Sequence, residues 1–134
     1  MKKPKVLCIC SMGINRSKYL ANYLKNKGYR TRYGGIGFGI IHEKAHNPFK
    51  QEDIDWAEVI IVVRKKHKPL LKKHYKVKGK RIIVLDVTDS RKIIGGKYSH
   101  LNNLDHPTFN RMWTYPQLRK AIKPYLPLKI NNVF

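Results

Sequence analysis

The residues best suited to chemistry lie together near the N-terminus, in residues 10–17, which follow the pattern Cys-x5-Arg-Ser. Cys10 follows an apolar, strand-like segment, and Arg16 and Ser17 open a segment with helical spacing. In that setting the loop amides converge into a concave nest, and the helix N-terminus adds partial positive charge. Arg16 can donate two parallel hydrogen bonds to the oxygens of a bound oxyanion. The pattern predicts a phosphate-binding loop.

The same positive environment favours the thiolate form of Cys10, whose sulfur is then a nucleophile aimed at phosphorus. Ser17 can donate a hydrogen bond to this thiolate, and Ser11 and Asn15 can brace the loop. The implied reaction transfers a phosphoryl group to sulfur and then hydrolyses the cysteinyl-phosphate. We therefore expect Cys10 and Arg16 to be catalytic. The substrate-binding residues are expected to be Ser11, Met12, Gly13, Ile14, Asn15 and Ser17.

Both steps of this reaction need a proton carrier, because the leaving group must be protonated and a water must later be deprotonated. Asp86 and Asp89 are the carboxylates that follow the last predicted strand. Asp86 directly follows that strand and has a structural cap as its alternative role, whereas Asp89 lies further into the loop. Asp89 is the preferred general acid and Asp86 the alternative. For Asp105, a further candidate, loop capping is the favoured interpretation.

Alternating apolar and amphipathic segments supply the framework for this loop. We expect strands at residues 5–10, 29–33, 59–63 and 81–85, and helices at residues 17–27, 51–57 and 65–75. Gly28 should end the first helix, and residues 34–39, with four glycines, should form a turn or loop. This alternation predicts an α/β fold, a three-layer sandwich around a central four-stranded parallel sheet. Ligands bind such sheets at the carboxyl ends of the strands, where residues 10–17 and 86–90 are expected.

The C-terminal part combines an irregular stretch with a final helix. Residues 93–107 contain a Gly-Gly pair and are predicted to be irregular. Residues 110–125 look helical, but Pro116 is tolerated only near a helix start, so the stronger helix is expected to begin there. Its inward side is formed by Leu118, Ile122 and Leu126, and the chain after Pro127 is expected to be loosely held.

The composition fits a single domain over residues 1–134 with a strongly basic surface. The chain has 29 Lys and Arg against 8 Asp and Glu, a formal net charge of +21. Such a charge attracts polyanions and phosphorylated ligands. From Arg64 to Arg81 there are ten basic residues and no acidic one. A solvated helix face is the simpler interpretation of this run, and a docking surface for nucleic acid or another polyanion is the functional one.

Several classes of protein are disfavoured by the composition. The two cysteines, Cys8 and Cys10, are too few for a disulfide framework or a structural zinc site, and the six histidines lack a compact metal-binding spacing. We therefore expect no metal and no cofactor, with Cys8 in the core. The longest apolar run, residues 59–63, is too short to span a membrane, and no signal peptide is evident. A reduced, cytoplasmic protein is the default expectation.

These features together resemble one known family. Residues 6–17, the strand at 59–63 with the preceding Asp-Trp-Ala, and the Asp-Val-Thr-Asp of residues 86–89 are similar to segments of the low-molecular-weight protein tyrosine phosphatases. The similarity is greatest to the family's small prokaryotic branch of predicted phosphatases and spans residues 5–90. The resemblance implies a phosphatase I-like fold. It also implies that Cys10 is the nucleophile, that Arg16 binds phosphate, that Ser17 bonds the thiolate and that Asp89 is the general acid.

Three positions depart from the family pattern. The family's Asp-Pro pair is Asp89-Ser90 here, and its mid-loop Asn is replaced by Gly13. The aromatic pair that grips a phosphotyrosine ring is replaced by Arg91-Lys92, which favours a more anionic substrate or a pocket walled by other aromatics such as Tyr98. Arsenate reductases of the same fold use further downstream cysteines, and none follows Cys10, which argues against that activity.

The sequence therefore predicts a cysteine-dependent phosphatase that acts on phosphomonoesters, with protein phosphotyrosine as the leading substrate class. One alternative is a catalytically weak phosphate-binding or nucleic-acid-binding module on the same scaffold. Another is a phosphatase that acts on a phosphate of RNA or of another polyanion.

Overall fold

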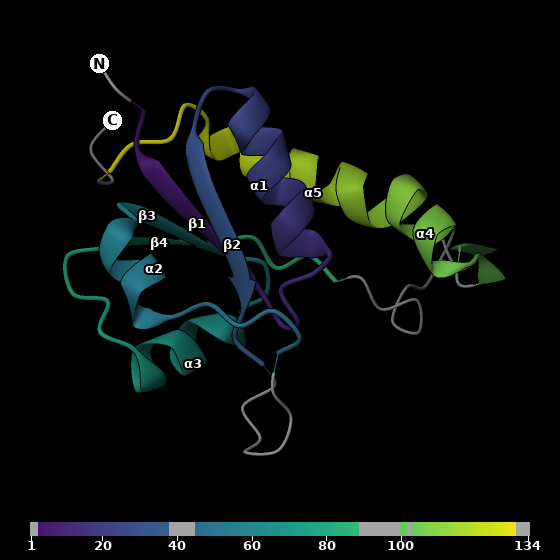
Figure 1. Cartoon of the computed structure of the whole chain (residues 1–134). Coiled ribbons are helices and arrows are strands. Elements are labelled where there is room, and N and C mark those ends of the chain that lie inside the picture. Colours follow the sequence, from purple (N-terminus) through teal and green to yellow (C-terminus); the bar gives the residue numbers. More distant parts are fainter. Residues whose placement is uncertain (1–2, 38–44, 89–99, 102, 131–134) are drawn as a thin grey trace.

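Four parallel strands form the centre of the molecule (Figure 1). The computed structural model describes residues 3–37, 45–88, 100–101 and 103–130. The strands are β1 (Lys5–Cys10), β2 (Arg30–Gly35), β3 (Val59–Val62) and β4 (Arg81–Val84), and they pair in the order β2-β1-β3-β4. Strand β1 is therefore central, and its carboxyl end carries residues 10–17.

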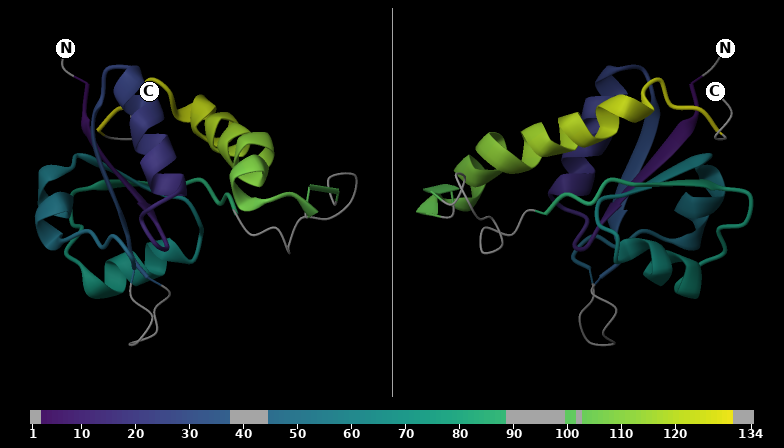
Figure 2. Two further views of the ribbon diagram at one scale, coloured as in Figure 1. Left: turned by 45° about the vertical axis from the view of Figure 1, so that its right-hand side comes forward. Right: turned by 180° about the vertical axis from the view of Figure 1, so that it is seen from behind.

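Helices cover both faces of the sheet, which confirms the predicted three-layer sandwich. Helices α1 (Arg16–Asn26) and α5 (Tyr115–Ile122) lie on one face, and α2 (Gln51–Trp56) and α3 (His67–His74) lie on the other (Figures 1 and 2). Gly28 follows the end of α1 with φ +97°, as expected for a glycine after a helix C-terminus. Every strand and helix predicted up to β4 is present, with bounds that differ by a few residues.

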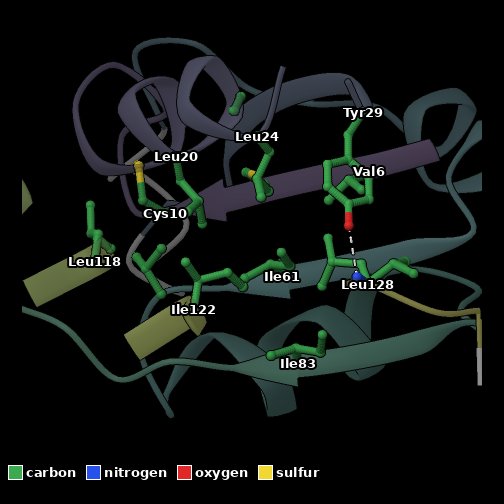
Figure 3. Close-up of a cluster of buried hydrophobic side chains, with 14 of the residues drawn as sticks. Val6, Cys10, Leu20, Leu24, Tyr29, Ile61, Ile83, Leu118, Ile122 and Leu128 are labelled. Carbon is green, nitrogen blue, oxygen red and sulfur yellow. Dashed lines mark hydrogen bonds between the residues drawn. The ribbon is translucent and has the colours of Figure 1, made fainter. Parts of the chain in front are cut away.

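The alternation of side chains along β1 divides the core into two layers. Val6, Cys8 and Cys10 belong to the cluster under α1 and α5, whereas Leu7 and Ile9 belong to the cluster under α2 and α3. Successive side chains of a strand point to opposite faces, so a strand buried on both sides is apolar throughout. Figure 3 shows the first cluster, with Cys10 at one end of it. Cys8 is fully buried, as predicted.

The glycines after the second predicted strand have a different role from the expected turn or loop. Gly34 and Gly35 belong to β2, and residues 38–39 of the predicted loop lie outside the described residues. A Cβ on Gly35 would lie 2.4 Å from the backbone carbon of Met12, and one on Gly34 would lie 2.7 Å from Cβ of Phe49. Glycine is required here because another backbone approaches closely.

The C-terminal helical segment begins earlier than the predicted start at Pro116. Helix α4 (His106–Phe109) continues through a π-helical turn (Asn110–Thr114) into α5 and a final 3-10 turn (Lys123–Tyr125). The backbone N–H of Tyr115 bonds the carbonyl of Asn110, five residues back. The wider π turn shifts the hydrogen-bond pattern just before Pro116, which has no N–H to donate. The prediction of irregular structure is therefore wrong at residues 106–107, and residues 93–99 lie outside the described residues.

The chain after Pro127 is held against the core, contrary to the sequence-based expectation. Leu128 is 4% exposed, and its backbone N–H donates a hydrogen bond of 2.8 Å to the hydroxyl of Tyr29 (Figure 3). Burial of a leucine side chain contributes about 1.5–3 kcal/mol. The inward side of α5 is as predicted, because Leu118 and Ile122 are fully buried and Leu126 packs against the same cluster.

Candidate active site

The predicted phosphate-binding loop lies between β1 and α1, at the carboxyl end of the sheet. Cys10 is 2% exposed, and two groups of its own loop approach its sulfur. The backbone N–H of Gly13 donates a hydrogen bond of 3.2 Å to Sγ, and Oγ of Ser17 lies 3.1 Å from Sγ. The sulfur thus has a backbone N–H and a serine hydroxyl within hydrogen-bond distance, next to the start of α1.

The shape of this loop depends on a glycine at position 13. Gly13 has φ +79°, and a Cβ there would lie 2.3 Å from the backbone nitrogen of Gly35 and 2.4 Å from the carbonyl oxygen of Asn47. Glycine and asparagine adopt positive φ most readily. The replacement of the family's Asn by Gly13 therefore keeps a residue that suits this backbone.

Asn47 fastens the outer side of the loop. Its backbone N–H donates to the carbonyl of Met12 at 2.9 Å, and its side-chain amide donates to the carbonyl of Gly13 at 3.0 Å. Its own carbonyl accepts from Gly35 at 2.8 Å. These bonds fix the backbone of the loop, and a fixed loop is the preorganisation that binding of an anion requires.

Arg16 is the charged member of the loop. It is 7% exposed, lines the cavity described below, and donates a hydrogen bond of 2.8 Å through Nη1 to the carbonyl of Val87. The segment that follows β4 thus orients the guanidinium against the loop. A guanidinium held in this way presents its other N–H groups to an oxyanion without a further loss of side-chain freedom.

Ser11 is held by a buried histidine that the sequence analysis did not assign to the site. Nε2 of His67 lies 2.9 Å from Oγ of Ser11, and His67 is fully buried at the start of α3. Burial, followed by the positive charges of Arg16, Lys66 and Arg64, lowers the pKa of His67 to about 3, against a smaller opposing effect of Asp86. His67 is therefore neutral at physiological pH and braces the loop without adding charge.

This histidine makes the stability of the protein depend on pH. Below the ordinary pKa of 6.5 the unfolded chain protonates His67, whereas the folded protein does so only near pH 3. Stability is therefore present above pH 6.5 and is lost as the pH falls from 6.5 toward 3. We expect His67→Gln to reduce this dependence by about 1.4 kcal/mol per pH unit between pH 4 and 6. Urea unfolding across this range measures it, and the exposed His74→Gln in the same helix is the matched control. An unchanged slope in His67→Gln would show that the buried ring is already protonated.

Asn15 is held from the opposite side by the C-terminal helical segment. Its side-chain amide donates to Oδ1 of Asn110 at 3.2 Å, and it accepts a hydrogen bond of 2.8 Å from the hydroxyl of Tyr115. The ring of Tyr115 stacks on Tyr19 of α1, with centroids 4.0 Å apart. Asn110 begins the π turn and Tyr115 follows it directly. The turn therefore lets two residues five positions apart both bond the side chain of Asn15.

A cavity of about 460 Å³ opens over this loop. Its floor comes from loop residues, and its wall comes from α4 and the π turn through His106, Pro107 and Asn110. Figure 2 shows this helical segment extending beyond the edge of the sheet. Ile14 is 52% exposed and also lines the cavity. The predicted loop residues that line it are Cys10, Ser11, Met12, Ile14, Asn15 and Arg16, while Gly13 and Ser17 contact the sulfur.

Two of the three candidate acids, Asp86 and Asp105, lie within the described residues, and both make hydrogen bonds there. Burial raises the pKa of Asp86, but the backbone N–H of Lys65 and the guanidinium of Arg64 outweigh it, so the pKa is lowered overall. The Arg64 contact is 3.1 Å, and Asp86 has φ +57°. Asp105 caps α4 by accepting hydrogen bonds from the backbone N–H and hydroxyl of Thr108, which lower its pKa. Both carboxylates are therefore held by contacts with neighbouring residues.

The preferred acid, Asp89, lies outside the described residues, as do Ser90, Arg91, Lys92 and Tyr98. Within the described residues, no group of three or more His, Cys, Asp or Glu side chains could hold a metal ion. In the same part of the chain, no helix is long and apolar enough to cross a membrane.

One of the three residues that the sequence analysis missed, His67, could have been found from the sequence. His67 follows β3 closely, so it lies at the ligand-binding edge of the sheet by the same rule that selected residues 10–17. Asn110 and Tyr115 reach Asn15 across about one hundred residues of sequence, and no local spacing connects them.

The chain has the fold of the low-molecular-weight protein tyrosine phosphatases. The tyrosine phosphatase Wzb from Escherichia coli K30 in complex with phosphate superposes with a TM-score of 0.61 at 16% identity, covering 92% of this chain and 90% of Wzb. The YwlE arginine phosphatase from Geobacillus stearothermophilus superposes with a TM-score of 0.58 at 17% identity, and the match covers 90% of this chain and 88% of YwlE. The low-molecular-weight protein tyrosine phosphatase from T. tengcongensis superposes with a TM-score of 0.55 at 16% identity, and the match covers 90% of this chain and 95% of that protein. No family model and no curated protein sequence matches the chain.

Proposed function

We propose that this protein is a cysteine-dependent phosphatase that hydrolyses phosphomonoesters through a cysteinyl-phosphate intermediate. The observation that carries the proposal is the sulfur of Cys10, which lines the cavity and is approached by Gly13 N–H at 3.2 Å and Ser17 Oγ at 3.1 Å. Arg16 lines the same cavity and supplies the positive charge that a phosphate dianion needs. The fold shared with known phosphatases supports the same conclusion.

The first chemical step follows from this arrangement. The nonbridging oxygens of the substrate phosphate bind the loop amides and the guanidinium of Arg16. The thiolate of Cys10 attacks phosphorus, so that an S–P bond forms while the P–O bond to the leaving group breaks. The leaving oxygen takes the electron pair of that bond and a proton from Asp89.

The second step restores the enzyme. The carboxylate of Asp89 accepts a proton from water as the water oxygen attacks phosphorus. The S–P bond then breaks, inorganic phosphate leaves, and Cys10 returns to the thiolate that Ser17 and Gly13 stabilise. One carboxyl group thus serves both steps, and no cofactor is needed. Since a thiolate is readily oxidised, we place the protein in a reducing compartment, the cytoplasm.

Protein phosphotyrosine is the proposed substrate class, and the apolar part of the cavity supports it. Met12, Ile14 and Pro107 give it apolar walls, which suit an aromatic ring attached to the phosphate. A panel of peptides with one sequence and either phosphotyrosine, phosphoserine or phosphoarginine tests this. We expect kcat/KM to be at least about tenfold higher for phosphotyrosine than for the others. Faster hydrolysis of another peptide would assign a different substrate, and hydrolysis of none would support a binding module.

The identity of the general acid gives a separate prediction. Asp89→Asn should lower kcat by about 10²–10⁴-fold for substrates with poor leaving groups and much less for an activated aryl phosphate, because only the former need a proton. Asp86→Asn is the matched control, since Asn tolerates the positive φ of that position. It should keep kcat while losing the negative charge that faces Arg64. If the two variants exchanged these results, Asp86 would be the acid.

The net charge of +21 favours a second candidate, a binding module for nucleic acid or phosphate without turnover. Such a module would bind RNA or DNA with an affinity that falls steeply with salt, and it would release no phosphate from an ester. A salt titration of both activity and binding separates the two. Hydrolysis of a small aryl phosphate that is insensitive to salt, with no affinity for nucleic acid, would exclude the second candidate.

A further inference from the structure

A second hollow, of about 540 Å³, lies outside the candidate active site, between α3 and the start of β4. Residue Arg81 begins β4, and Lys68 lies in the first half of α3. Among the residues that the structure describes, no acidic side chain lines the hollow. The positively charged side chains that line it are Lys68, Lys72, Lys78, Lys80 and Arg81.

The backbone around this hollow is fixed by hydrogen bonds. The side-chain amide of Gln51 in α2 makes two hydrogen bonds of 2.9 Å to the backbone of Lys76. Its nitrogen donates to the carbonyl of Lys76, and its oxygen accepts from the N–H of Lys76. Nζ of Lys80 donates to the carbonyls of Asp55 and Ala57 at 3.0 and 2.7 Å. These contacts hold the chain between α3 and β4 in place, so the hollow exists before any ligand arrives.

Arg81 is tied to the C-terminal segment that also lines this hollow. Its Nη1 donates to the carbonyl of Lys129 at 2.9 Å, and Ile130 follows directly. Nε of Arg81 is buried and has no hydrogen-bond partner among the described residues. A buried guanidinium N–H without a partner is costly, and an anion in the hollow would reduce that cost.

Three further cations line the hollow and form no ion pair with a described residue. Across the described part of the chain, no ion pair or hydrogen bond engages the ammonium groups of Lys68, Lys72 or Lys78. Lys68 and Lys72 are four residues apart on α3, where like charges repel one another and destabilise a helix. Such clustering of like charge is relieved when an anion binds, which gives the hollow a preference for ligands with several negative charges.

The remaining walls of the hollow favour one class of polyanion. They come from the aliphatic side chains of Val77, Ile82 and Ile130, and among the described residues no aromatic ring lines the hollow on which a nucleobase could stack. Single-stranded nucleic acids draw much of their affinity from such stacking. We propose that this hollow is a binding site for a linear chain of phosphates, such as inorganic polyphosphate, which needs closely spaced cations and no stacking platform.

This site is separate from the phosphatase chemistry. Cys10 ends β1, whereas Arg81 begins β4, and the two strands run parallel in one sheet. The hollow lies along α3 and the start of β4, whereas the phosphate-binding loop lies at the carboxyl end of β1. The two sites share no lining residue. Loss of one site should leave the other intact.

Binding of a polyphosphate of defined length to the whole protein tests the proposal. The triple variant Lys68→Gln, Lys72→Gln, Lys78→Gln should bind at least tenfold more weakly than the original protein. The slope of log affinity against log salt concentration should be smaller by about two. The control is the triple variant Lys18→Gln, Lys25→Gln, Lys120→Gln, which removes the same charge from exposed positions on the opposite face of the sheet. It should bind within about threefold of the original protein.

Two more measurements make the result decisive. Arg16→Ala should bind polyphosphate as the original protein does, and the Lys68, Lys72 and Lys78 variant should hydrolyse an aryl phosphate at the original rate. Equal weakening in both triple variants would overturn the proposal in favour of net charge alone. Loss of binding in Arg16→Ala would assign polyphosphate to the catalytic loop. Tight binding of single-stranded RNA without binding of polyphosphate would likewise overturn it.

Discussion

Replacement of Cys10 by serine should abolish hydrolysis of an aryl phosphate, with kcat lowered by at least about a thousandfold. A serine hydroxyl ionises far less readily than a thiol, so the donors at 3.2 and 3.1 Å from the sulfur would have no anion to stabilise. Because serine is close to cysteine in size, the loop should keep its shape. Cys10→Ser should therefore still bind inorganic phosphate, which a phosphate-dependent rise in melting temperature would report.

Cys8 provides the matched control for this experiment. It lies two residues earlier in β1, on the same face of the sheet, and is fully buried. Burial, with a smaller effect of Cys10, raises the pKa of the Cys8 thiol above its usual range, so it remains neutral. Cys8→Ala should keep kcat and lose about 1 kcal/mol of stability to the small cavity it leaves. A Cys10→Ser protein with the original kcat would refute the proposed nucleophile.

Replacement of Arg16 by lysine should lower kcat/KM by about 10²–10³-fold, although the positive charge is kept. An ammonium group cannot make two parallel hydrogen bonds to the phosphate oxygens while a further N–H bonds the carbonyl of Val87, as Nη1 of Arg16 does at 2.8 Å. The loss should fall mainly on kcat, because the oxygens gain charge in the transition state. Steady-state kinetics with an aryl phosphate measure it.

The structural part of this effect is separable from the chemical part. Loss of the bond to Val87 should cost about 1.5–3 kcal/mol of stability, which urea unfolding at neutral pH reports. Arg119→Lys is the matched control, since Arg119 also makes one short hydrogen bond, to the hydroxyl of Tyr19, and lies on the surface of α5. It should leave kcat/KM unchanged. A similar loss of kcat/KM in both variants would mean that Arg16 acts only through the fold.

Local patterns were sufficient to predict the layout of the sheet and the composition of the loop. Apolar runs of strand length alternate with amphipathic segments, and this alternation leaves few topologies besides a parallel sheet with helices on both faces. The loop residues are contiguous, so Cys10, Gly13, Arg16 and Ser17 could be recognised together. Their placement at the carboxyl end of a buried strand follows from the general rule for such sheets.

The predictions were wrong where the conformation of a segment depends on contacts with residues far away in the sequence. Gly34 and Gly35 resemble a turn because glycine is common in turns, but here the backbones of Phe49 and of the catalytic loop approach them. The chain after Pro127 resembles a loose tail, but Tyr29 binds Leu128 across about one hundred residues.

The sequence by itself determined the loop that carries Cys10 and Arg16 and the sheet that presents it, because these depend on adjacent residues and on the period of the hydrophobic residues. Only the tertiary structure decided what surrounds them. It placed His67 against Ser11, joined Asn110 and Tyr115 to Asn15, and gave the cavity a wall from α4. The physical reason is that these contacts join segments whose distance in space is set by packing of the helices on the sheet, which no local pattern of residues encodes.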